Sequence, residues 1–162
     1  MTYHVRPIRD RDWDSIVQLE AAAYAEGGLS EGRAALESRG RAAPATSFVL
    51  DTGERIVGYL LALPYPRFRY PDLALAEQSV IDSSSLHLHD LVIDGGFRGN
   101  GLAKRLLHHL TETARLKMYE RISLIAVAGS HGFWSANGYH AHPEIVLPSS
   151  YGANAVYMSR RA

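Results

Sequence analysis

The segment Leu86–Ala103 reads LHLHDLVIDGGFRGNGLA and carries three signals of local structure in succession. The apolar residues of Leu86–Ile93 predict a strand, and Asp94–Gly99 is a glycine-rich turn that follows it. Leucines then recur at helical spacing and predict a helix over Leu102–Lys117. Such a turn brings free backbone N–H groups and the positive dipole end of a helix beside glycines, where a phosphate can approach closely.

The turn differs from two common nucleotide-binding loops. Arg98–Ala103 lacks the Gly-Lys-Ser/Thr ending of a Walker A loop, and the Rossmann spacing G-x-G-x-x-G is absent. From the glycines alone, a phosphate cradle and a tight strand-to-helix turn without a ligand are equally good interpretations.

The residues before this segment predict alternating strands and helices. Hydrophobic periodicity defines each element, and glycines and prolines mark the boundaries. The expected elements are a strand at Tyr3–Ile8, a helix capped by Asp10 or Asp12 and ended by Gly27 and Gly28, a polar helix at Ser30–Arg39, and a β-hairpin of Ser47–Leu50 and Arg55–Leu63.

A long connection separates the hairpin from the segment quoted above. Prolines and aromatic residues alternate in Pro64–Ser85, and a short helix is expected at Leu73–Gln78. Connections longer than about 12–15 residues are often functional, which makes this one a candidate substrate-facing segment. A surface loop held by its aromatic side chains is an equally good interpretation.

The C-terminal part predicts a strand at Ile122–Ala128 and a short helix at Phe133–Ala136 that ends at Asn137 and Gly138. Two last strands are expected at Tyr139–Leu147 and Ala155–Arg160.

Length and composition restrict the class of protein. With 162 residues, 46% hydrophobic and 21% charged, the chain is expected to form a single domain over residues 1–162. Because 17 Lys and Arg balance 17 Asp and Glu, a nucleic-acid partner is not expected. The absence of cysteine excludes disulfides, thiolate metal sites and a cysteine nucleophile. No signal peptide or membrane-length apolar run is found, so a cytoplasmic protein without a membrane partner is expected.

Three stretches together resemble a known family. Arg98–Ala103 fits the pattern R-x-x-G-x-A and is similar to the pyrophosphate motif of the GNAT superfamily of acyl-CoA-dependent N-acetyltransferases. Leu91–Ile93 resembles the strand that precedes this motif in the family, and Phe133–Tyr139 resembles its F-Y-x-x-x-G-F helix end. The resemblance is specific over residues 86–139.

The resemblance implies an α/β fold with a mixed sheet. The expected sheet is twisted, mostly antiparallel, and has 6–7 strands with one splayed parallel pair, flanked by about four helices. It implies acetyl-CoA as co-substrate, no metal, and direct attack of a primary amine in a ternary complex. The cofactor-binding residues that it implies are Leu91, Val92, Ile93, Arg98, Gly99, Asn100, Gly101, Leu102, Ala103, Lys104 and Phe133, with a backbone N–H near Val92 at the oxyanion.

Two histidines are candidates for the general base. Attack on a thioester needs an unprotonated amine, and His, with a pKa of about 6.5, is suited to removing that proton. His87 and His89 lie two positions apart on the predicted strand, which places them on one face and Asp90 on the other. The run H-L-H-D-L-V-I resembles the arylalkylamine (serotonin) branch of the superfamily, where an H-x-H pair relays the proton. A half-buried histidine without a catalytic role remains the alternative for either ring.

One position departs from the family pattern. Trp134 stands where the family often has the tyrosine that returns a proton to the CoA thiolate, and an indole N–H has no usable acidity. Water or another hydroxyl must then supply that proton, and Tyr151 is the candidate substitute. Tyr151 lies in the turn between the last two expected strands, and its role as this proton donor is a hypothesis.

Two other functions remain open. His87 and His89 together with His140 and His142 form two H-x-H pairs, which a transition metal could bind. A catalytically silent CoA-binding regulatory domain is the second alternative. In the preferred interpretation the partner is a small-molecule amine, and the protein is a monomer or a homodimer. An aromatic or apolar acceptor fits the Pro64–Tyr70 aromatics, whereas Arg67 and Arg69 favour an anionic group.

Overall fold

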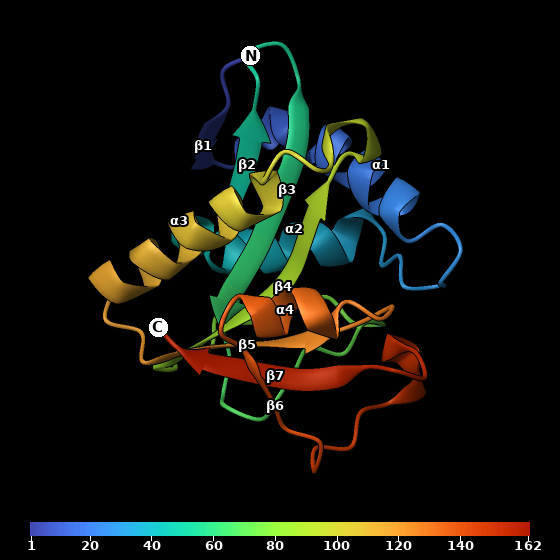
Figure 1. Ribbon diagram of the computed structural model, residues 1–162, viewed down its shortest axis with the longest axis vertical. Helices are drawn as coiled ribbons and strands as arrows, with labels where there is room; N and C mark the ends of the chain where they lie inside the picture. The colour runs from blue at the N-terminus through green and yellow to red at the C-terminus, as the bar shows by residue number, and fades with distance from the viewer.

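The computed structural model describes residues 1–162 and is built around one seven-stranded sheet in the order β1-β2-β3-β4-β5-β7-β6 (Figure 1). All neighbouring strands are antiparallel except β4 and β5, which are parallel. The predicted mixed sheet with one parallel pair is thereby confirmed. The strands are β1 (His4–Pro7), β2 (Phe48–Asp51), β3 (Ile56–Pro64), β4 (Ser85–Ile93), β5 (Arg121–Ala126), β6 (His140–Ala141) and β7 (Val156–Arg161).

Four α-helices cover the two faces of the sheet. The third and fourth lie in front of the strands in Figure 1, and the first two lie behind them. Their bounds are α1 (Trp13–Ala23), α2 (Arg33–Ala42), α3 (Leu102–Leu116) and α4 (His131–Ala136), with single 3-10 turns at Asp10–Asp12, Pro44–Thr46, Gly95–Phe97 and Ser149–Tyr151. None of these helices combines the length and the apolarity that a membrane span requires.

Each face of the sheet has its own apolar core. The leucine stripe of α3 packs on one face, where Leu106 and Leu110 are completely buried. On the opposite face Trp13 and Ile16 of α1 pack with Leu36 of α2. The stripe predicted from helical spacing therefore fixes α3 against the sheet and holds the start of that helix at the end of β4.

Three local predictions are wrong. Residues 73–78 form no helix, because the backbone of this stretch bonds to α2 instead: Glu77 N–H donates to Ser38 Oγ (2.8 Å), and the Leu75 carbonyl accepts from Arg39 (3.1 Å). The strand expected at Tyr139–Leu147 is limited to His140–Ala141, and Pro143 follows shortly after it. A proline cannot donate to a ladder, which accounts for this early end.

The third concerns the cap of α1. Asp12 stands at the N-cap position, but its side chain makes no capping hydrogen bond. Its carboxylate instead accepts from the Arg9 N–H (2.7 Å) and from the Arg6 guanidinium (2.8 Å), tying β1 to the start of the helix.

The parallel pair separates after a short contact. β4 and β5 pair at Ser85–Leu88 with Arg121–Leu124 and then diverge. On its other side β4 has a bulge: Leu61 of β3 pairs with Asp90 and Ala62 pairs with Leu88, so His89 has no partner opposite it. The divergence and the bulge together open the sheet beside His89.

Candidate functional site

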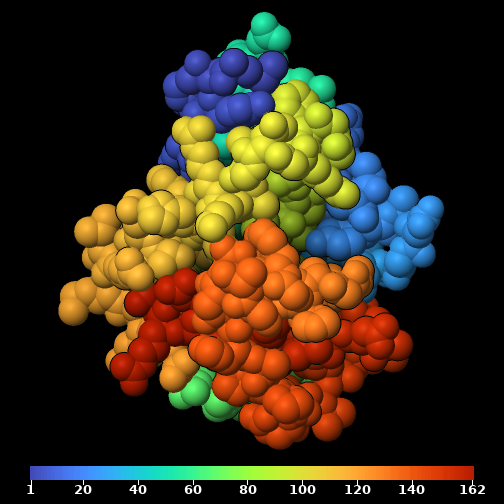
Figure 2. Space-filling model, in the orientation of Figure 1, coloured from blue at the N-terminus to red at the C-terminus, as the bar shows by residue number.

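A cavity of about 770 Å³ lies where β4 and β5 diverge. Hydrophobic residues make up 18 of the 26 that line it, a size and composition typical of small-molecule sites. Its walls come from β4, β5, the turn before α3, α4 and the connection after α1. The turn before α3 (yellow), α4 (orange) and the α1–α2 connection (blue) border the same part of the surface in Figure 2.

One end of the cavity is formed by the glycine-rich turn and the start of α3. Gly99 (φ +83°) and Gly101 (φ +71°) adopt left-handed backbone conformations that favour glycine. The first helical hydrogen bond of α3 runs from Arg105 N–H to the Gly101 carbonyl (3.1 Å). The N–H groups of Leu102, Ala103 and Lys104 come before it and have no acceptor within the helix. These donors, with the Arg98 and Lys104 side chains on the wall, make this end suited to an anion.

The predicted cofactor residues lie together at this cavity with one exception. Leu91, Val92, Ile93, Arg98, Gly99, Gly101, Leu102, Ala103, Lys104 and Phe133 all line it. Asn100 does not, and its side-chain amide donates to the Phe97 carbonyl (3.1 Å) within the turn.

The backbone of β4 supplies a second set of polar groups. Asp94 N–H donates to the Val57 carbonyl of β3 (2.8 Å). Along a strand the backbone N–H and C=O groups of successive residues point to alternate sides. The backbone groups of Val92 therefore also point toward β3, while those of Leu91 and Ile93 point to the opposite side. β5 is no longer paired there, which leaves the Leu91 and Ile93 groups directed toward the cavity.

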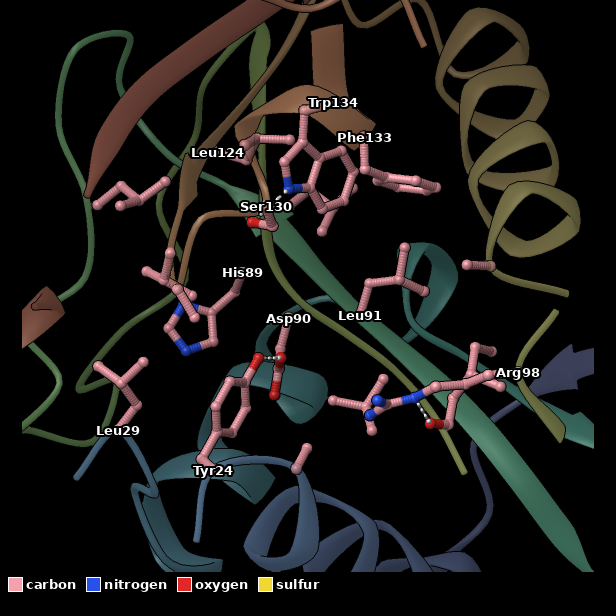
Figure 3. Close-up of a pocket in the computed structure, with 18 of the residues that line it drawn as sticks. Tyr24, Leu29, His89, Asp90, Leu91, Arg98, Leu124, Ser130, Phe133 and Trp134 are labelled. Atoms are coloured by element: carbon pink, nitrogen blue, oxygen red, sulfur yellow. Dashed lines mark hydrogen bonds between the residues drawn. The ribbon is translucent and has the colours of Figure 1, made fainter. Parts of the chain in front are cut away.

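His89 lies on the cavity wall on the opposite side from Arg98 (Figure 3). Its Nε2 is 2.6 Å from Oε2 of Glu31, a residue of the α1–α2 connection. The two side chains are only 2% and 4% exposed. The other ring nitrogen, Nδ1, is buried and has no hydrogen-bond partner. One nitrogen of the ring is thus fixed by Glu31, and the other has no hydrogen-bond partner within the protein.

His87 occupies a different environment. Its ring centroid is 6.1 Å from that of His89 and 6.0 Å from that of Tyr65, but His87 is fully buried and does not line the cavity. Burial, reinforced by the charge of Arg39 and by that of His89 whenever the His89 ring is protonated, lowers the pKa of His87 well below its usual value. At neutral pH this ring is therefore uncharged.

A completely buried arginine binds the Glu31 carboxylate at the oxygen that does not contact His89. Arg39 of α2 donates to Glu31 Oε1 from Nε (2.8 Å) and Nη2 (2.5 Å), and it also bonds to Glu77. Burial alone would raise the pKa of Glu31, but the hydrogen bond with His89 and the charge of Arg39 hold it below its ordinary value. Glu31 is consequently an anion whose two oxygens serve different partners.

Asp90 also lines the cavity, contrary to the prediction that it faces away from His89. The bulge at His89 shifts the alternation and places both residues on the same wall. Asp90 accepts from the hydroxyls of Tyr24 (2.6 Å) and Tyr59 (2.5 Å). Burial raises the pKa of Asp90 to about 6, against the lowering effect of the two tyrosines.

Two residues with a hydroxyl group, Ser130 and Tyr151, also line the cavity. Trp134 lines the cavity, and its indole N–H donates to Ser130 Oγ (3.3 Å), which leaves the Ser130 hydroxyl proton free to donate. Tyr151 also lines the cavity, and its hydroxyl donates to the Pro71 carbonyl. Burial raises the pKa of Tyr151. Both hydroxyls therefore keep their protons at neutral pH.

Several lining residues were not identified from the sequence. Glu31 lies in the segment predicted as a polar helix, and Leu29 follows the glycines predicted to end the first helix. Leu73 lies in the predicted substrate-facing connection but was not singled out there, and Tyr24 and Ser130 gave no distinguishing signal. Of the long connection Pro64–Ser85, only Leu73 lines the cavity; Arg67 and Arg69 do not.

The two H-x-H pairs do not form a metal site in this structure. No group of three or more His, Cys, Asp or Glu side chains is arranged to hold a metal ion. His142 instead contacts Ser159 Oγ through Nε2 (2.7 Å). His87 is buried, and its ring lies near that of Tyr65.

The comparisons with known proteins agree with this geometry. A model of the acetyltransferase (GNAT) family matches residues 13–139. No curated protein matches the chain in sequence.

Solved structures with the same fold cover almost the whole chain. The GphF GNAT-like decarboxylase in complex with isobutyryl-CoA is 21% identical over 98% of both chains, with a TM-score of 0.80. The loading GNATL domain of CurA from Lyngbya majuscula is 16% identical over 99% of this chain and 98% of that one, with a TM-score of 0.79. The paia N-acetyltransferase from Thermoplasma acidophilum, in complex with coenzyme A, is 11% identical over 100% of both chains, with a TM-score of 0.73.

Proposed function

We propose, since the chain belongs to the acetyltransferase (GNAT) family, that it transfers an acetyl group from acetyl-CoA to a primary amine in a ternary complex. One observation carries the proposal: a single cavity has an anion-binding turn at one end and His89 at the other. The cavity can therefore hold a phosphorylated acyl donor and an acceptor at the same time. The absence of cysteine agrees with direct attack rather than a cysteine acyl-enzyme.

The donor end would take the pyrophosphate on the N–H groups of the turn and of the first residues of α3. Arg98 and Lys104 add positive charge there. The pantetheine arm would lie between the separated strands, where β5 does not pair the backbone groups of Leu91 and Ile93. Of these groups, the Ile93 carbonyl also accepts from Arg98 Nε (3.4 Å).

The reaction needs three groups around the thioester. The amine nitrogen attacks the carbonyl carbon and forms the C–N bond while His89 accepts the amine proton. A backbone N–H of the unpaired β4 edge stabilises the oxyanion, the C–S bond then breaks, and the CoA thiolate leaves. The thiolate takes a proton from solvent, from the Ser130 hydroxyl, whose proton is free, or from the Tyr151 hydroxyl, which would have to give up its hydrogen bond to the Pro71 carbonyl.

The acceptor end favours an amine with an uncharged apolar body. Tyr24, Leu29 and Leu73 contribute apolar surface, and the charged groups there are the carboxylates Glu31 and Asp90. Because no arginine or lysine side chain lines this end, an acceptor with its own carboxylate would be desolvated without a counter-ion.

A matched pair of acceptors tests this function. With acetyl-CoA, benzylamine is expected to release CoA thiol and yield an equal amount of N-acetyl product, at a kcat/KM about 100-fold above that of 4-(aminomethyl)benzoate. Thiol release without N-acetyl product would indicate hydrolysis, and binding of acetyl-CoA without any turnover would support a silent CoA-binding domain. Equal use of both acceptors would refute the proposed acceptor class.

The donor end has its own matched test. Gly101 and Gly53 both have positive φ, and a Cβ added at either position would meet no atom within 4 Å, but Gly53 lies in the β2–β3 turn, away from the cavity. Alanine at either position is expected to cost about 1–2 kcal/mol in backbone strain. Only Gly101→Ala should also weaken acetyl-CoA binding, by about tenfold in calorimetry, because its Cβ would crowd the proposed phosphate site. Equal affinities of the two variants would argue against the turn as that site.

A further inference from the structure

We propose that Glu31 is a positioning residue for His89: it holds the hydrogen of the neutral imidazole on Nε2 and thereby makes Nδ1 the atom that accepts the amine proton. The role of Nδ1 in turnover rests on the proposed acetyl transfer, whereas the position of the hydrogen does not. The inference follows from how the two oxygens of Glu31 and the two nitrogens of His89 are distributed among their partners.

The hydrogen bond between the two side chains has a defined direction. An ionised carboxylate can only accept, and the Glu31 carboxylate is ionised because His89 and Arg39 lower its pKa despite burial. His89 must then donate from Nε2 across the 2.6 Å contact. In a neutral ring this leaves the lone pair on Nδ1, the nitrogen without a partner.

Glu31 is itself fixed by groups outside the cavity. Arg39, with no exposed side-chain surface, binds Oε1, so that Oε2 faces His89. Glu20 accepts from the Glu31 backbone N–H (2.7 Å) and from Ser30 Oγ (2.5 Å), which anchors the connection at that point. The carboxylate thus cannot exchange its two oxygens without breaking the bonds to Arg39.

This arrangement makes one substitution informative. In Glu31→Gln the amide oxygen is expected to stay with Arg39, which has only donors, so the amide NH₂ faces His89 Nε2. Nε2 must then accept, and the ring hydrogen moves to Nδ1. The variant keeps the size of the side chain but inverts the tautomer and blocks the proposed base.

The experiment is ¹⁵N NMR of the histidine rings in the full chain, with the His89 signals assigned by comparison with His89→Gln. The wild-type protein is expected to show hydrogen on Nε2 and a bare Nδ1, and Glu31→Gln the reverse together with about a 100-fold lower kcat. Glu77→Gln is the matched control, because Glu77 also binds Arg39 but does not contact His89 or line the cavity. Its His89 tautomer should be that of the wild-type protein.

A hydrogen on Nδ1 in the wild-type protein would overturn the inference, and this measurement needs no variant to fold. So would a Glu31→Gln protein whose tautomer and kcat both equal those of the wild type. If the wild-type protein acetylates no amine, the proposed acetyl transfer fails, while the tautomer still decides whether Glu31 orients the ring.

Discussion

Replacing His89 with alanine is expected to lower amine acetylation by about 10²–10⁴-fold at pH 7, the usual contribution of a general base. The loss should shrink as the pH approaches about 10, where an alkylamine with a pKa near that of Lys is already deprotonated in solution. The measurement is kcat/KM for benzylamine from near-neutral to alkaline pH. An equal loss at every pH would contradict a proton-accepting role and indicate that His89 only shapes the cavity.

His87→Leu is the control for this prediction. His87 is buried beside His89 but does not line the cavity, so its removal should leave the pH dependence of acetylation unchanged. If both variants lose activity in the same pH-dependent way, the two rings act together as a relay. Acetyl-CoA affinity should be the same in both variants, because the anion-binding turn lies on the other side of the cavity.

Replacing Arg39 with methionine is expected to lower the free energy of unfolding by about 3–5 kcal/mol, the cost of leaving buried charges without their partner. The substitution would strand the Glu31 and Glu77 carboxylates, whose side chains are 4% and 10% exposed. It would also leave the carbonyls of Asp72 and Leu75 without a donor. Urea unfolding of the two proteins gives the difference directly.

Arg41→Met is the matched control on the same helix. Arg41 is 54% exposed and pairs with Asp10 at 3.1 Å, so its loss should change stability by about 1 kcal/mol or less. A change of similar size in both variants would mean that the buried network around Arg39 contributes no more than a surface ion pair. Recovery of stability in a combined Arg39→Met, Glu31→Leu, Glu77→Leu protein would support the stranded charges as the cause.

The segment around the glycine turn was predictable because its signals are local. A strand expected at Leu86–Ile93 is found at Ser85–Ile93, and a helix expected at Leu102–Lys117 is found at Leu102–Leu116. Apolar periodicity and glycines with positive φ determine these elements without long-range information. The family resemblance, which rests on the same residues, extended this to the sheet topology.

The acceptor end was not predictable in the same way. Glu31 meets His89 across 58 positions in the sequence, through the packing of α2 and the α1–α2 connection on the sheet. A glutamate in a segment predicted as a polar helix is expected to be exposed, and no local pattern marks Glu31 as buried. The placement of Asp90 depends on a bulge that arises only when β4 pairs with β3. Such features are set by tertiary contacts that a single sequence does not display.

The short contact between β4 and β5 also bears on how the sheet meets other polypeptides. Beyond Leu88 and Leu124 the two strands present unpaired edges inside the molecule rather than at its rim. An open strand edge is a template on which another polypeptide can add and aggregate. Here the two edges lie in the middle of the sheet, between β3 and β7, and border a cavity that α4 and the start of α3 also line. Because strands of the same sheet lie on both sides of them, these edges can serve a small molecule while they are not at the rim where another sheet would add.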